Sequence, residues 1–138
     1  MRSGFAGRGV CGIDTTTQRQ TAFVGFGAGF DAALSGMAID LTGSRLFLQG
    51  QTHVYVYDTA TLTQIGVVAP QSKDPNLSLA GILMGPDGFT VYVDDRNSAT
   101  AFYTIDARTL TATEADTPTP APSASGEPYF SPFLLVLP

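Results

Sequence analysis

The chain has few of the residue types that build most functional sites. Only 14% of its 138 residues are charged, and it contains one histidine, one cysteine and no tryptophan. The lone Cys11 excludes an internal disulfide and a cysteine-based zinc site. The chain has twelve acidic and seven basic residues, and Lys and Arg form no cluster in the sequence. Because nucleic-acid binding needs a basic patch, we expect no nucleic-acid partner.

Long apolar runs are missing too. No window approaches the roughly 20 apolar residues that a membrane helix needs, so we expect no membrane span. The first ten residues are rich in glycine and lack the apolar core of a secretory signal. The residues themselves therefore assign no compartment.

Turn-forming residues are abundant instead. The chain has 15 glycines and 9 prolines, and 43% of its residues are hydrophobic, which is typical of a turn-rich globular protein. Apolar and β-branched residues form short runs of about five, with no helical periodicity. This pattern predicts an all-β fold.

One internal repeat is a hairpin. Segments 36–48 and 81–93 match in their leading glycine, in a turn glycine and in a closing apolar triplet, at an offset of 45 residues. The turns contain Gly43 in one copy and Asp87 with Gly88 in the other, which is a hairpin signal.

A second pattern occurs three times, at 10–21, 54–65 and 102–113. In each copy an apolar strand ends at an aspartate and a threonine follows three residues later. The carboxylate can accept hydrogen bonds from the backbone just after it and so reverse the chain. The residues predicted to build turns are Asp14, Asp58, Asp106, Gly43, Asp87 and Gly88.

Together the repeats predict β-propeller blades, since a repeat of 40–50 residues with four strands is the signature of that fold. We expect a half-blade at 10–33 and complete four-stranded blades at 34–78 and 79–116. A Pro- and Ser-rich connector follows at 117–128, and 129–138 is interpreted as the first hairpin of a further half-blade. The whole chain is then one propeller segment.

The hairpins resemble the YVTN-type β-propeller repeat, a group that includes lactonase-like and quinoprotein-amine-dehydrogenase-like propellers. The resemblance lies in Pro86-Asp87-Gly88 before Tyr92-Val93 and in the run 57–61, and it covers about 10–115. Asp94-Asp95 departs from the Thr-Asn that is usual there. These motifs specify packing and turns, so they imply a fold and no catalytic residue. An exported or periplasmic location is implied by the resemblance alone.

The predicted blades do not close a ring. About three blades are present, whereas propellers close with four to eight. Either the chain is part of a longer protein, or two copies form a homodimer that closes a ring of about six blades. Both alternatives stay open at the level of sequence.

In a propeller, the loops after the second and fourth strands of each blade share one face, and this is where we expect a ligand. A run of two carboxylates, a guanidinium and an amide there could bind a cation or ligand, but it is also typical of a solvated loop with an Asp–Arg pair. The sole histidine could act as a base or be a hydrogen-bonded structural residue. The candidate binding residues are His53, Asp94, Asp95, Arg96 and Asn97.

No catalytic residue, metal site or cofactor is predicted. We expect a non-enzymatic propeller module or fragment that presents its loop face to a protein or small-molecule ligand of unknown identity. The alternative is part of a lactonase-like or quinoprotein-like enzyme whose catalytic residues lie outside this chain.

Overall fold

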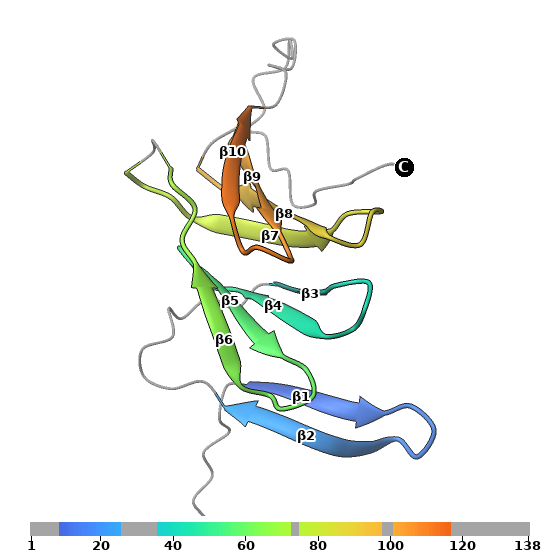
Figure 1. Ribbon diagram of the computed structural model, residues 1–138. Helices are drawn as coiled ribbons and strands as arrows, with labels where there is room; N and C mark the ends of the chain where they lie inside the picture. Colours follow the sequence, from blue (N-terminus) through green and yellow to red (C-terminus); the bar gives the residue numbers. More distant parts are fainter. Residues whose placement is uncertain (1–8, 26–35, 73–74, 98–100, 117–138) are drawn as a thin grey trace, which may run out of the picture. The chain divides into compact units, whose positions relative to one another are not determined.

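A computed structural model describes residues 9–25, 36–72, 75–97 and 101–116. Within these ranges the regular structure is β-strand, paired into three antiparallel sheets (Figure 1). The all-β class predicted from the repeats is therefore confirmed. No helix in the described part of the chain is long and apolar enough to cross a membrane. The predicted connector at 117–128 and hairpin at 129–138 lie outside the described residues.

The chain divides into two compact units, and the first spans residues 1–30. Its described part is a hairpin of β1 (Gly9–Asp14) and β2 (Arg19–Gly25). The pairing register shifts between Gly12 and Ile13.

The second unit, residues 31–138, contains two four-stranded sheets. The first sheet has the order β3-β4-β5-β6, in which each strand pairs with its neighbour in sequence. Its strands are β3 (Gly36–Ile39), β4 (Arg45–Gln49), β5 (Val54–Asp58) and β6 (Gln64–Val68).

The second sheet repeats this meander. Its strands are β7 (Leu79–Met84), β8 (Thr90–Asp95), β9 (Ala101–Asp106) and β10 (Ala112–Asp116). Side chains alternate between the two faces of a strand, and each sheet therefore presents apolar side chains on both of its faces.

The core of the unit lies between the two sheets. On the first sheet, Ala38, Phe47 and Val56 are directly paired across β3, β4 and β5, and we call the face that carries them its front face. On the second sheet, Val91 and Ile105 are paired and share a face that we call its back face. All five belong to one buried cluster, and four of them have no exposed surface. The front face of one sheet thus packs on the back face of the next.

Two glycines allow the sheets to approach closely. A Cβ atom on Gly36 would lie 2.8 Å from Cγ2 of Ile82 on β7, and a Cβ atom on Gly66 would lie 2.8 Å from Cδ1 of Leu110. Both distances are shorter than van der Waals contact allows, so a larger residue at either position would push the sheets apart.

Candidate functional site

The second unit has two chemically different ends. Tight turns join β3 to β4, β5 to β6, β7 to β8 and β9 to β10, and we call this the turn end. The antiparallel order puts the remaining connections at the opposite end. These are the β4–β5 loop at 50–53, the β6–β7 connector at 69–78 and the β8–β9 loop at 96–100, and we call this the loop end.

At the turn end, the Asp-x-x-Thr segments form the hydrogen-bonded turns that their spacing favours. Oδ1 of Asp58 accepts hydrogen bonds from the backbone N–H of Ala60 at 3.0 Å and of Thr61 at 2.8 Å. The Thr61 hydroxyl donates to the same oxygen at 2.9 Å. Equivalent backbone bonds reach Asp14 in the hairpin of the first unit and Asp106 in the second sheet.

The residue four positions after each of these aspartates has a left-handed backbone. The φ angles are 54° at Gln18, 54° at Leu62 and 59° at Leu110, and each N–H donates to the carbonyl of its aspartate. A non-glycine residue pays a conformational cost there. At Leu110 the cost is offset because the side chain packs against the core.

The two β-hairpin turns at this end require glycine. Gly43 and Gly88 have φ angles of 71° and 74°, which only glycine adopts without strain. In the second turn, Asp87 accepts hydrogen bonds from the N–H of Phe89 and Thr90, both at 2.9 Å, and from the Thr90 hydroxyl at 2.6 Å.

The matching turn of the first sheet is built on a buried carboxylate that the sequence did not single out. Asp40 is 7% exposed. Its Oδ1 accepts the N–H of Arg45 at 3.0 Å, and its Oδ2 accepts the hydroxyls of Thr42 at 2.7 Å and Ser44 at 3.1 Å. Burial alone would raise the pKa of Asp40, but these donors outweigh it and hold the pKa below the usual value.

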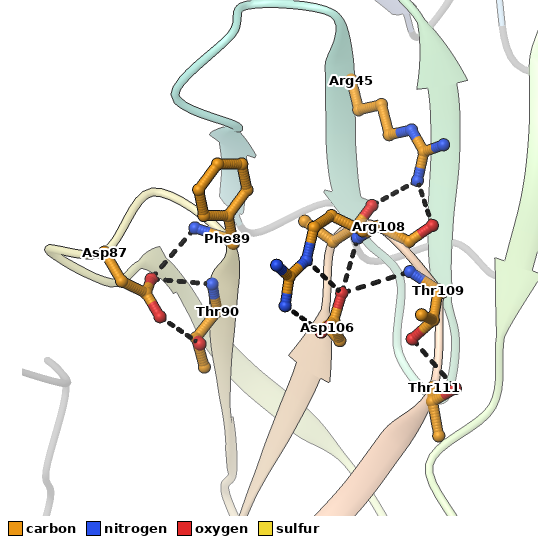
Figure 2. A network of polar contacts seen from close by, with 9 residues as sticks. Arg45, Asp87, Phe89, Thr90, Asp106, Arg108, Thr109 and Thr111 are labelled. Carbon is orange, nitrogen blue, oxygen red and sulfur yellow. Dashed lines mark hydrogen bonds and ion pairs between the residues drawn. The ribbon is translucent and has the colours of Figure 1, made fainter.

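The turn end also fastens the two sheets together. Figure 2 shows the Arg45 guanidinium from β4 reaching the β9–β10 turn, where Nη1 donates to the carbonyls of Ala107 and Arg108. The backbone N–H of Leu41 donates to Gly88 O at 3.0 Å between the two hairpin turns. The polar groups of this end are therefore largely used in structural contacts.

Beside this contact, Arg108 folds back on its own turn. It pairs with Asp106 at 2.8 Å and lies 5.1 Å from the centre of the Phe89 ring. The Arg108 side chain is the main cause that holds the pKa of Asp106 well below its usual value, and the N–H groups of Arg108 and Thr109 add to it. The arrangement is a surface ion pair that supports a turn.

The loop end is held by a chain of backbone hydrogen bonds. Leu79 N–H donates to Gln51 O at 2.7 Å and so ties the start of β7, directly after the β6–β7 connector, to the β4–β5 loop. Arg96 N–H donates to Ser78 O at 2.7 Å and ties the same connector to the β8–β9 loop. The side-chain amide of Asn97 donates to the carbonyl of Asn76. Three segments from both sheets thus form one platform.

Asp95 lies at the centre of this platform and is only 2% exposed. Its Oδ1 accepts the N–H of Ser78 at 3.2 Å and of Asn97 at 3.1 Å. Its Oδ2 is buried and receives no hydrogen bond from the described residues. A buried carboxyl oxygen without a donor is costly, so this atom has an unmet need for a hydrogen bond among the described residues.

The other members of the predicted cluster are placed differently from Asp95. Asp94 points to the opposite face of β8, where it is paired with Phe102 of β9. Burial raises the pKa of Asp94, against a lowering by the Asp95 N–H, and the neighbouring charge of Asp95 adds to the increase. Arg96 and Asn97 are exposed.

The alternative of a solvated loop with an Asp–Arg pair is therefore wrong for Asp95, which is buried. Among the described residues, no ion pair joins Arg96 to Asp94 or Asp95. The reason is strand alternation: Val91, Val93 and Asp95 share the back face of β8, so the last of them follows the valines into the interior.

His53 belongs to the same end of the unit, in the β4–β5 loop. It is partly buried, its Nδ1 lies 2.8 Å from the Thr52 hydroxyl, and its ring centre lies 6.2 Å from that of Tyr55. Its backbone carbonyl accepts the N–H of Gly50. No group of three or more His, Cys, Asp or Glu side chains that could hold a metal ion occurs in the part of the chain that the structure describes.

Comparisons with known proteins agree with this architecture. No protein-family model matches the chain, and no curated protein matches it. Among solved structures it is similar to hydrazine synthase of Kuenenia stuttgartiensis, with a TM-score of 0.63 and 22% sequence identity. The match covers 79% of this chain but only 30% of the matched chain of that protein, which contains β-propeller domains.

This likeness concerns the fold. The chain has two four-stranded antiparallel meanders and a hairpin, and it resembles part of a propeller-containing protein, as the repeats predicted. At this level of identity, the similarity carries no information about chemistry.

Proposed function

We propose that this chain is a non-enzymatic β-propeller segment of the YVTN repeat type whose loop end binds a protein or small-molecule ligand. The observation that carries the proposal is the buried Oδ2 of Asp95, which receives no donor from the described residues although the rest of the platform is hydrogen-bonded. A ligand that offers an N–H, a hydroxyl or an ammonium group would satisfy this oxygen.

The contrast between the two ends supports the proposal. At the turn end, both carboxylate oxygens of Asp40 and of Asp87 accept hydrogen bonds from their own turns. At the loop end, exposed Arg96 and Asn97 flank an acceptor whose second oxygen is unused. A binding face needs polar groups that are held in place but keep hydrogen-bonding capacity for a ligand. The loop end suits that role better than the turn end.

The second candidate is part of a lactonase-like or quinoprotein-like propeller enzyme. Such an enzyme would draw its catalytic residues from other blades, and among the described residues no group of three or more His, Cys, Asp or Glu side chains could hold a metal ion. The platform would then contribute to the substrate pocket of a larger ring.

The test is a ligand screen by thermal shift with a panel of amines, amino acids, short peptides and sugars. Asp95→Asn keeps the Oδ1 acceptor but replaces Oδ2 by a donor, so it should abolish the stabilisation that a true ligand gives. Arg96→Ala should weaken that stabilisation, and Arg108→Ala is the matched control, because it removes one exposed arginine from the turn end.

A ligand whose effect is lost in Arg108→Ala and retained in Asp95→Asn would refute the placement of the site at the loop end. Turnover of a lactone or amine by a complex that contains this chain, lost in Asp95→Asn, would instead favour the enzyme.

A further inference from the structure

The buried Asp95 has no counter-charge in the part of the chain that the structure describes. Its Oδ1 accepts two backbone N–H groups, and its Oδ2 accepts no hydrogen bond from the described residues. No ion pair within those residues involves Asp95. A buried carboxylate needs compensation for its charge as well as donors for its oxygens. A cation with N–H groups would meet both needs at once, whereas a neutral hydroxyl would meet only the second.

A second buried polar side chain, Gln49, lies on the facing surface of the first sheet. It is the last residue of β4, is paired with Gly36 and has no exposed surface. A Cβ atom on Gly36 would lie 3.5 Å from Oε1 of Gln49 and 2.8 Å from Cγ2 of Ile82, so this amide oxygen lies against β7. Ile82 is paired with Val93, two residues before Asp95 on the back face of β8. Gln49 and Asp95 therefore both lie between the sheets, toward the loop end.

Tyr103 is the third buried polar side chain of this region. It is paired with Val93 and has no exposed surface. It is a diagonal neighbour of Asp95 on the back face, at a separation that a long aromatic side chain can bridge. Carbonyl and hydroxyl oxygens have two lone pairs each, so one existing hydrogen bond leaves them able to accept another. We call Gln49, Asp95 and Tyr103 the oxygen layer.

The oxygen layer matches an ammonium group better than other cations. An ammonium group carries the positive charge that Asp95 needs and has three N–H donors for three oxygens. Calcium takes six to eight oxygen ligands and prefers several carboxylates, whereas the layer has one. Because Asp95 is only 2% exposed, a small head group on an unbranched chain fits better than a planar guanidinium. The net charge of −5 also favours the approach of a cation.

We propose that the ligand of the loop end is a protonated primary amine, whose ammonium group is held between the two sheets by Asp95, Gln49 and Tyr103. Oδ2 of Asp95 accepts one N–H in a charge-assisted hydrogen bond, and the amide and phenol oxygens accept the other two. This inference rests on the ligand site proposed above and narrows its ligand to one chemical class.

Thermal unfolding of the full chain with methylammonium chloride tests the proposal. At the best known ligand efficiency, two heavy atoms give a Kd of about 6 mM, and a tenfold weaker ligand at about 100 mM still raises the midpoint by about 3 °C. Tetramethylammonium chloride and potassium chloride at the same concentration are the references, because neither cation has an N–H group. Asp95→Asn should abolish the increase. Asp40→Asn is the matched control and should retain it, because this buried carboxylate receives its donors from its own turn.

A tethered ammonium group tests the geometry without an added ligand. Gln49→Lys puts an ammonium group on β4, where Asp95 can pair with it. This variant should unfold within a few degrees of the wild type and lose its response to methylammonium. Gln49→Lys combined with Asp95→Asn buries the ammonium group without a counter-charge, so its midpoint should be at least about 10 °C lower than that of Gln49→Lys alone.

Three results would overturn the proposal. The first is an equal increase with methylammonium and tetramethylammonium, and the second is an equal increase with potassium, which would make the layer a metal site. The third is an equal midpoint for Gln49→Lys with and without Asp95→Asn.

The ligand screen separates this inference from the proposed function. A neutral ligand that stabilises the wild type and not Asp95→Asn, with no effect of methylammonium, would contradict the amine and support the loop-end site. If no ligand, charged or neutral, depends on Asp95, both proposals are wrong.

Discussion

The two buried aspartates of the second unit should respond differently to the same substitution. Asp40 and Asp95 are 7% and 2% exposed, and they lie at opposite ends of the sheets. Asp40 accepts two hydroxyls at Oδ2, whereas Oδ2 of Asp95 accepts no hydrogen bond from the described residues. Replacement by asparagine preserves the shape of each side chain, removes its negative charge and replaces Oδ2 by an amide nitrogen that donates and does not accept.

In Asp40→Asn, the amide can still accept the N–H of Arg45, but it cannot accept from Thr42 or Ser44. One hydroxyl can rotate and accept from the new amide, so the net loss is close to one charge-assisted hydrogen bond, about 1–2 kcal/mol. For a folded unit of this size, such a loss lowers the thermal midpoint by about 4–8 °C per kcal/mol.

In Asp95→Asn, both backbone hydrogen bonds to Oδ1 are kept and no existing hydrogen bond is lost. The variant should be as stable as the wild type within about 0.5 kcal/mol, because the weaker hydrogen bonds to a neutral oxygen are offset by the removal of a buried carboxylate whose second oxygen has no donor. Urea unfolding followed by far-UV circular dichroism measures both variants. Equal destabilisation of Asp40→Asn and Asp95→Asn would show that Oδ2 of Asp95 has a donor within the protein. That result would contradict the binding role proposed for this oxygen.

Two further predictions concern the packing and the turns. Gly66→Val should destabilise the unit by about 1–3 kcal/mol in the same assay, since its Cβ atom would collide with Leu110, and a simultaneous Leu110→Ala should recover part of the loss. The Thr90 hydroxyl is the main cause that lowers the pKa of Asp87 below 3.8, and the N–H groups of Phe89 and Thr90 add to it. The ionised Asp87 therefore contributes its full share to the stability of the fold above pH 3.8, and this contribution is lost as the pH falls through the lower pKa of the folded state. Acid unfolding should begin below about pH 4, and the stability of Asp87→Asn should change less over that range; an unchanged acid profile would contradict the assignment.

The turns could be predicted from sequence because their causes are local. An aspartate followed by backbone donors, or a glycine with a positive φ, is decided within five residues of chain. Asp58 and Gly88 were therefore identified without knowledge of the packing. The left-handed Leu62 and Leu110 were missed, because neither residue type favours that conformation and no glycine or asparagine marks the position.

Contacts that depend on the packing of the sheets could not be predicted. Arg45 follows a turn and resembles a surface residue in the sequence, yet its guanidinium reaches carbonyls more than 60 positions away. The burial of Asp95 could have been inferred, since it continues the alternation of Val91 and Val93. The polar residues next to Asp95 favoured the interpretation of 94–97 as a solvated loop, so its burial was not predicted.

The two sheets differ at one position of the turn end. Arg45 and Thr90 occupy equivalent sites at the start of β4 and β8. Arg45 reaches across to the turn of the next sheet, whereas the Thr90 hydroxyl is directed to Asp87 in its own turn. Among the described residues, the first sheet therefore has an arginine that fastens it to its neighbour, and the second sheet has none at the equivalent position.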